Sequence, residues 1–229
     1  MALMHLLAHS IPALAKSGDP PPQEPLILTD EQGQYPLGLH LDILEDPSGE
    51  LTIAEVASPE YAASFEPSQE AVPNYGFTES VFWLRLRLRS ETRQADEWLL
   101  ETNFQNLNYV DLYLPSEEGG YWVKESGALR PFDTRDIPYY HVVFNLPLES
   151  QAEGTYYIRV ESGSSMTLAF TLWSLESFAV NKISDMLVIG LFYGALLIAL
   201  AYHFFLFLSL REPNYLYLVL FLASYGLEQ

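Results

Sequence analysis

The chain of 229 residues contains no cysteine, which excludes disulfides, cysteine nucleophiles and cysteine-ligated metals. Lysine and arginine are scarce, at 11 against 30 acidic residues, so the net charge is −19. Nucleic acids and anionic membrane surfaces are both bound through basic patches. The composition therefore argues against both partners and is typical of a well-solvated acidic surface. We predict no metal and no cofactor.

Catalytic motifs are also missing. The sequence has no G-x-S-x-G, no H-E-x-x-H and no Cys–His pair. His40 and His141 stand alone, and a lone histidine in a strand is usually structural. Carboxylate pairs occur, but in so acidic a chain they discriminate nothing. We expect no enzymatic activity in this chain. A membrane-tethered carbohydrate-active enzyme is the weakest of the three functions considered, after the receptor and the interaction module described below.

Charge is absent from the stretch Leu187–Leu210, which has 24 residues. At about 1.5 Å per residue this stretch exceeds a hydrocarbon core of roughly 30 Å and predicts a first transmembrane helix, 187–210. After the polar break 211–214, residues 215–229 predict the start of a second helix that returns antiparallel to the first. We interpret the chain as a piece of a longer polytopic membrane protein, with Arg211 in the cytoplasm.

The N-terminal part shows signs of export. Residues 1–15 are mostly apolar and close on Ala13-Leu14-Ala15, as in a signal peptide that has lost its basic start. The alternative is that export relies on the first membrane helix. Residues 16–34 form a proline-rich lead-in, KSGDPPPQEP being its core.

Residues 35–175 carry short runs of period-2 alternation separated by turn residues, without a long helix. This pattern predicts an all-β fold, an antiparallel β-sandwich or jelly roll, with 51–65 as a short helix or loop crossing one end. Residues 176–186 look helical and predict a joint to the first membrane helix. The expected strands are 37–44, 81–89, 97–102, 109–114, 121–125, 139–146, 155–161 and 166–173.

In the strand Val81–Arg89, three arginines alternate with four apolar residues. The arginines could grip an anionic ligand, or they could pair with acids on adjacent strands. Aromatic residues are numerous enough for a sugar-stacking platform, although core packing explains most of them equally well. Arg135 lies in a loop-like stretch, where binding residues concentrate, but it could instead pair with a neighbouring aspartate. Our predicted ligand-binding set is Trp83, Arg85, Trp122, Arg135 and Tyr140.

In the first membrane stretch, Gly190 and Gly194 have the small-xxx-small spacing that lets helices approach closely. They predict a packing face within a bundle or a dimer, or they are ordinary membrane-helix glycines. His203 belongs to the same predicted packing set. An intramembrane histidine is a functional candidate, but near a helix end it more often hydrogen-bonds a neighbouring helix.

The order of several segments resembles a known family. DPSGELTIAEV, TESVFWLRLRLRS, WLLETNFQNLNYVDLYL, GALRPFDTRD, FNLPL, YYIRVES and TLAFTLWS resemble the type-2 periplasmic domain of bacterial seven-transmembrane receptors with diverse intracellular signalling modules (7TMR-DISM). The segment beginning GLFYGALLIALAYHFFLFLSL resembles the start of that family's membrane region. The resemblance covers roughly residues 36–229. It implies a jelly-roll sensory domain, seven membrane helices and a cytoplasmic output module.

We therefore expect the sensory N-terminal part of a bacterial receptor, multi-pass in the inner membrane with its sandwich in the periplasm. The sandwich would bind a small ligand, for which a saccharide is the leading class, and would transmit binding to an output module outside this chain. The alternative is a membrane-anchored interaction or carbohydrate-binding module without signalling. A homodimer is compatible with either hypothesis.

Overall fold

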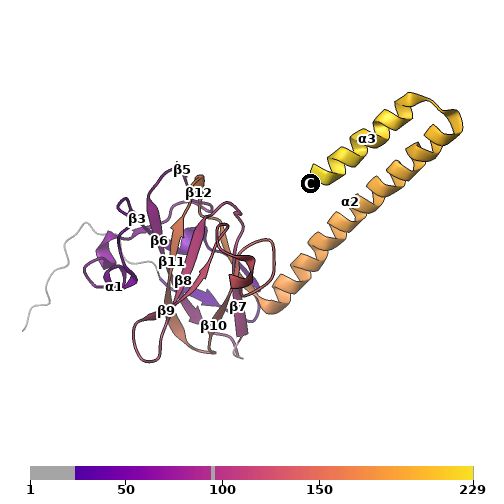
Figure 1. Ribbon diagram of the computed structural model, residues 1–229. Coiled ribbons are helices and arrows are strands. Elements are labelled where there is room, and N and C mark those ends of the chain that lie inside the picture. Colours follow the sequence, from indigo (N-terminus) through magenta and orange to yellow (C-terminus); the bar gives the residue numbers. More distant parts are fainter. Residues whose placement is uncertain (1–23, 94–95, 229) are drawn as a thin grey trace, which may run out of the picture.

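The computed structural model describes residues 24–93 and 96–228, so the predicted signal peptide, 1–15, lies outside the described residues. Figure 1 shows a β-sandwich followed by two antiparallel helices that project away from it. The sandwich is built almost entirely from antiparallel strand pairs, and it confirms the predicted all-β sandwich fold.

The larger sheet has the strand order β4-β3-β6-β11-β8-β9, and β1 pairs with β6 in parallel at one end of that strand. We call it the large sheet. Its central strand β6 is the clearest strand of the sequence, because its even-numbered residues from 82 to 88 are apolar and face the interior. The strands are β1 (Leu26–Leu28), β3 (Leu41–Asp46), β4 (Glu66–Pro67), β6 (Val81–Ser90), β8 (Tyr109–Pro115), β9 (Tyr121–Ser126) and β11 (Glu153–Glu161).

The second sheet, the small sheet, has the order β10-β7-β13-β2. Its members are β2 (Gln34–Pro36), β7 (Asp96–Thr102), β10 (Val143–Leu148) and β13 (Phe170–Ser174). A two-stranded sheet of β5 (Asn74–Phe77) and β12 (Ser165–Thr167) stands beside them. Three 3-10 turns complete the domain, η1 (Gly38–His40), η2 (Ala62–Ser64) and η3 (Phe132–Thr134).

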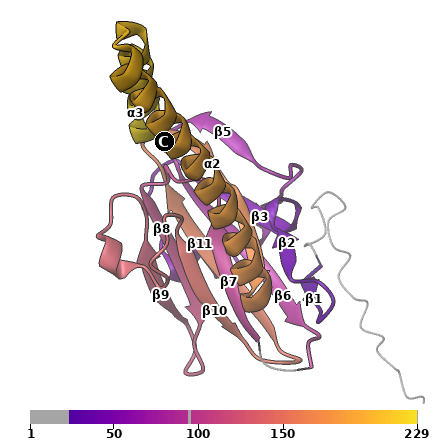
Figure 2. The ribbon, with the colours of Figure 1, turned by 90° about the vertical axis from the view of Figure 1, so that its right-hand side faces the viewer.

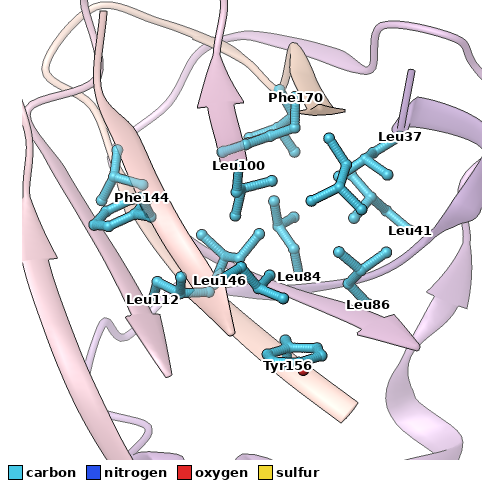
Figure 3. Close-up of a cluster of buried hydrophobic side chains, with 14 of the residues drawn as sticks. Leu37, Leu41, Leu84, Leu86, Leu100, Leu112, Phe144, Leu146, Tyr156 and Phe170 are labelled. Atoms are coloured by element: carbon cyan, nitrogen blue, oxygen red, sulfur yellow. The ribbon is translucent and has the colours of Figure 1, made fainter. Parts of the chain in front are cut away.

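The main core lies between the two sheets. Phe82, Leu84, Leu86 and Leu88 of β6 are almost fully buried there. Figure 3 shows leucines of the large sheet meeting Leu100, Phe144, Leu146 and Phe170 of the small sheet. The alternation of β6 thus decides which face of the strand enters the core, because successive side chains point to opposite sides.

Two boundaries differ from the sequence prediction. The stretch 16–34, predicted as a lead-in, contains β1, whose Leu28 is fully buried in the core. The sandwich therefore includes residues before position 35, because three apolar residues suffice to extend a sheet once β6 offers free backbone groups. The predicted strand 37–44 is also shorter, since η1 occupies Gly38–His40 before β3 begins.

The segment 51–65 does not cross one end of the sandwich; it covers the outer face of the large sheet. It contains α1 (Ile53–Val56), whose N-terminus has a capping box between Thr52 and Glu55, and η2. Val56 and Phe65 are buried against Val81, Trp83 and Tyr157 in a second apolar cluster. Burial of these rings explains why the segment lies flat on the sheet.

The predicted joint 176–186 and the predicted span 187–210 lie in one continuous helix, α2 (Leu175–Leu210). Of the described helices, α2 alone is long and apolar enough to cross a membrane. Arg211 ends it in a left-handed conformation, with φ 53°, and α3 (Pro213–Glu228) begins with proline at its first position and folds back along α2 (Figure 1).

The three predicted packing residues lie on two sides of α2. His203 faces α3, where its ring centroid is 6.4 Å from that of Tyr215, but its Nδ1 lies 2.8 Å from the carbonyl oxygen of Ala199 in the same helix. A side chain at Gly190 or Gly194 would meet no neighbouring helix in the described part of the chain, whereas Gly226 of α3 packs on Leu196. The described part of α3 therefore packs on a face without these glycines.

Candidate functional site at the junction of the sandwich and helix α2

A fully buried carboxylate joins the sandwich to α2. Glu101 of β7 has no exposed surface. Its Oε1 accepts a hydrogen bond from Lys182 Nζ of α2 at 2.7 Å and lies 2.7 Å from His141 Nδ1. Its Oε2 accepts a hydrogen bond from Trp173 Nε1 at 2.8 Å. We call these four residues the Glu101 node.

The sheet register explains why these side chains meet. Glu101 lies opposite Val143 of β10 and Thr171 of β13, so it occupies the centre of the small sheet and faces outward. Trp173 follows Thr171 on the same face, by the two-residue period of a strand. The N-terminal turns of α2 contact β7 and β13, and the rest of the helix leads away from the sandwich (Figure 1, Figure 2). The first turn of α2 is fixed by Ser174, whose side chain accepts a hydrogen bond from the Ser177 backbone.

Aromatic rings surround the ammonium group of Lys182. Its Nζ lies 5.0 Å from the ring centroid of Phe178, 5.1 Å from that of Tyr139 and 5.6 Å from that of Trp173. Phe178 is itself buried with Leu99, Val143 and Trp173 in a third apolar cluster. The ion pair is therefore shielded from water. In such a buried environment, charge–charge and cation–π interactions are stronger than at an exposed site.

The environment of the node shifts the pKa values of two groups. Burial alone would raise the pKa of Glu101, but the hydrogen bonds from His141 and Lys182 outweigh burial and lower it. Burial, a hydrogen bond with Tyr140 and the nearby negative charges raise the pKa of Tyr139. At physiological pH Glu101 is therefore ionised, and the node contains a negative charge. Tyr139 beside it is neutral.

A hollow of about 370 Å³ opens beside the node, between the loop before β10 and α2. Two of the predicted ligand residues are here. Tyr140 lines the hollow and is half-exposed. Arg135 donates hydrogen bonds from Nη1 to the carbonyl oxygens of Tyr139 and Tyr140. Its guanidinium group lies 4.8 Å from the ring centroid of Phe132. Arg135 thus supports the loop. Of the two neighbouring aspartates that could have paired with it, Asp133 and Asp136, the second is bound by Lys124.

Trp122 lies on β9 and is linked to the same loop indirectly. Lys124 Nζ is 5.5 Å from the Trp122 ring centroid and also donates to Asp136 and to the Asn145 carbonyl oxygen. Trp122 is 45% exposed, so it is accessible to solutes. The structure brings Arg135 and Tyr140 together and places Trp122 beyond them on the edge strand.

The remaining two predicted residues lie on the opposite side of the sandwich. Trp83 is fully buried under the segment 51–65 and offers no surface to a ligand. Arg85 is bound to Asp42 by an ion pair of 2.9 Å and donates to the Ala62 carbonyl oxygen. The sequence analysis placed both residues in a ligand contact. The structure corrects this placement, because the segment 51–65 covers this face of the sheet.

The arginines of β6 instead pair with acids of neighbouring strands, the alternative considered above. Arg87 also contacts Asp42, at 3.0 Å, and Arg89 pairs with Glu153 of β11 at 2.8 Å. Asp42 is 2% exposed, whereas the Arg89–Glu153 pair is about half-exposed. The ladder is therefore structural, and its buried end is the counterpart of the Glu101 node on the other sheet.

A second hollow, about 450 Å³ in volume, lies at the β3–β5 side of the sandwich. Tyr75, 45% exposed, forms one wall, and its ring stacks on Phe82 with centroids 4.4 Å apart. Burial and the three nearby carboxylates raise the pKa of Tyr75, so its hydroxyl stays protonated. We call this hollow the Tyr75 cleft; it is also lined by Glu45, Glu66, Gln69, Glu70 and Asn74.

Sequence reasoning missed Glu101, Lys182 and Tyr75. Glu101 and Lys182 are 81 positions apart, so no local motif joins them. One available signal was a lone acid in the apolar run WLLET, since a buried charge in a strand centre needs a partner. Tyr75 lies in a segment for which no strand was predicted.

The fold and the node define a class: a β-sandwich fixed to a long apolar helix of membrane-spanning length. Residues 38–174 match the family described as 7TMR-DISM extracellular 2, and residues 185–229 match the one described as 7TM diverse intracellular signalling. The chain belongs to the 7TMR-DISM family, which confirms the resemblance. The family is one of membrane proteins of the sensory receptor type, with an extracellular domain.

No curated protein matches the chain. Among solved structures, it is similar to TmCBM61, determined in complex with beta-1,4-galactotriose, at 11% identity and a TM-score of 0.32. That match covers 60% of this chain and 91% of the other.

Proposed function

We propose that this chain is the sensory part of a bacterial membrane signalling receptor. Its sandwich binds a small ligand in the periplasm, and α2 carries the response through the inner membrane to an output module. The observation that carries this proposal is the Glu101 node, because it fixes the centre of the small sheet to the helix that enters the membrane. A flexible tether would transmit no displacement, whereas the buried Glu101–Lys182 pair, also held by His141 and Trp173, couples movement of β7 to movement of α2.

For the ligand we propose a saccharide bound in the Tyr75 cleft. An exposed tyrosine ring provides a flat face for sugar C–H groups, and carboxylate and amide side chains accept and donate hydrogen bonds to hydroxyls. Glu45, Glu66 and Glu70 give the cleft negative charge. We therefore expect neutral or amino-bearing saccharides to bind in preference to uronic acids.

The test uses the full chain in lipid nanodiscs and a panel of neutral, amino and acidic oligosaccharides, with thermal unfolding as the readout. Tyr75→Ala should abolish stabilisation by the active sugar, and the matched variant Tyr140→Ala, at a similarly exposed tyrosine, should preserve it. The reverse result would move the site to the loop beside α2. Absence of stabilisation by every saccharide would contradict the ligand class.

Transmission has its own readout. Because the chain has no cysteine, Phe77→Cys with Val180→Cys gives two exposed positions for spin labels, one on the sandwich and one on α2. We expect the active sugar to shift the distance between the labels, and Lys182→Met to remove that shift while sugar binding remains. An unchanged shift in Lys182→Met would overturn the role of the node.

A further inference from the structure

The hollow beside α2 has the composition of a site for a positively charged amine. Its walls contain the rings of Phe132, Tyr139 and Tyr140, and Asp185 is the charged side chain among the residues that line it. Aromatic faces attract ammonium groups, and quaternary ammonium ligands are bound by such rings. A single carboxylate at the rim adds a favourable charge. The remaining lining residues are Pro138, Met186 and Ile189.

The position of the hollow along α2 indicates which amine-bearing molecules surround it. The charge-free stretch Leu187–Leu210 is centred between Ile198 and Ala199. A hydrocarbon core of about 30 Å corresponds to about 20 helical residues, so its outer boundary falls near Ile189. Asp185 then lies about 6 Å outside that boundary, within the headgroup layer of roughly 5–7 Å on each side. The hollow spans this layer.

We propose that this hollow binds the headgroup of a zwitterionic phospholipid of the outer leaflet, with the ammonium group among the rings and beside Asp185. The lipid is the occupant because the wall formed by Met186 and Ile189 continues into the membrane-spanning part of α2. Phe132 and Tyr140, 57% and 51% exposed, lie beside this wall, as aromatic residues do in interfacial belts. Arg135, stacked on Phe132, supplies a cation near the position of the phosphate.

The site also contacts the Glu101 node. Tyr139 lines the hollow and at the same time contributes a ring to the Lys182 environment. A bound headgroup would hold the loop against α2 from the membrane side. This inference does not depend on the ligand of the Tyr75 cleft.

The first experiment measures lipid retention. The full chain is reconstituted in nanodiscs with equal phosphatidylethanolamine and phosphatidylglycerol, released into mild detergent and analysed by native mass spectrometry. We expect selective retention of phosphatidylethanolamine, reduced about tenfold in Asp185→Asn. Glu176→Gln, an exposed acid on the same helix outside the hollow, should retain it like the parent chain. Equal retention of both lipids, or an unchanged Asp185→Asn, would overturn the proposal.

The second experiment measures depth and separates the lipid from a free amine. Nitroxides at Phe132→Cys and at Glu117→Cys, the latter in the β8–β9 turn, are compared for collisions with oxygen and with a water-soluble nickel chelate. The Phe132 position should favour oxygen and the Glu117 position the chelate. Free phosphoethanolamine at millimolar concentration should leave both unchanged. Equal chelate access at the two positions, or retention displaced by phosphoethanolamine, would exclude a membrane lipid as the occupant.

Discussion

Each sheet of the sandwich holds a buried, ion-paired acidic residue on its outer face, Asp42 on the large sheet and Glu101 on the small one, and these two acids have different neighbours. On the large sheet, Asp42 binds Arg85 and Arg87, both from the same sheet, under a cover formed by the segment 51–65. On the small sheet, Glu101 binds Lys182, which belongs to α2. Similar electrostatics thus stabilise the domain on one side and attach it to the membrane helix on the other.

The largest effects should come from removing the two acids. Glu101→Ala and Asp42→Ala each leave buried cations without a partner, which costs about 3–5 kcal/mol of the free energy of unfolding. Chemical denaturation of the full chain in micelles, followed by near-ultraviolet circular dichroism, measures both. A spin label at Val180→Cys on α2 should gain mobility in Glu101→Ala and stay unchanged in Asp42→Ala. Equal mobility in both variants would remove the distinction between the sheets.

The next largest loss of stability should come from replacing the cations that pair with these two acids. Lys182→Met keeps most of the apolar stem but leaves Glu101 with His141 and Trp173, at a cost of about 1.5–3 kcal/mol for a lost charged hydrogen bond. The matched change Arg87→Met leaves Asp42 paired with Arg85 and should cost less. Denaturation midpoints in micelles compare the two. If Arg87→Met is the more harmful change, Asp42 depends on both arginines and the large sheet is the more sensitive one.

The pH dependence is a smaller effect and follows from the pKa of Glu101. Because the fold lowers this pKa below its ordinary value of 4.5, the ionised carboxylate stabilises the folded state at neutral pH. That contribution is lost as the pH falls below about 4.5 and passes through the folded-state pKa. Unfolding midpoints measured from pH 7 to pH 3 should decline less steeply in Glu101→Gln. Parallel curves would show that other acids dominate the decline.

The smallest effect is expected at the exposed end of the arginine ladder. Arg89 and Glu153 are about half-exposed, so solvent screens their ion pair and Arg89→Ala should change the free energy of unfolding less than any substitution above. Thermal unfolding at low and at 0.5 M salt checks this. A loss of stability as large as that of Arg87→Met would mean that burial does not determine how much each arginine of β6 contributes.

Alternation predicted the strands whose two faces differ strongly. The clearest example is β6, where leucines and arginines alternate over most of the strand. Short strands such as β1 and β5 escaped, because three or four residues carry too little alternation and their pairing depends on a distant partner. The ligand residues were predicted from residue type and from local position in the sequence. Trp83 was misplaced because sequence does not reveal that the segment 51–65 covers its face.

The node could not be predicted for a related reason. His141 was interpreted as a structural histidine, and its contact with Glu101 depends on how the loop before β10 folds over the small sheet. The pairing of Glu101 with Lys182 depends on the direction in which α2 leaves β13. Local patterns determine strands and helices, whereas these contacts are set by the packing of the finished domain.

The unbroken course of α2 has a mechanical consequence. Its 36 residues form a lever about 54 Å long, held near one end by Lys182. A rotation of the sandwich by about 5° about that pivot would displace the far end of such a rod, at Leu210, by roughly 4 Å, given its length. Rearrangements too small to alter the shape of the sandwich would therefore arrive on the other side of the membrane as movements of a size that helix contacts can register.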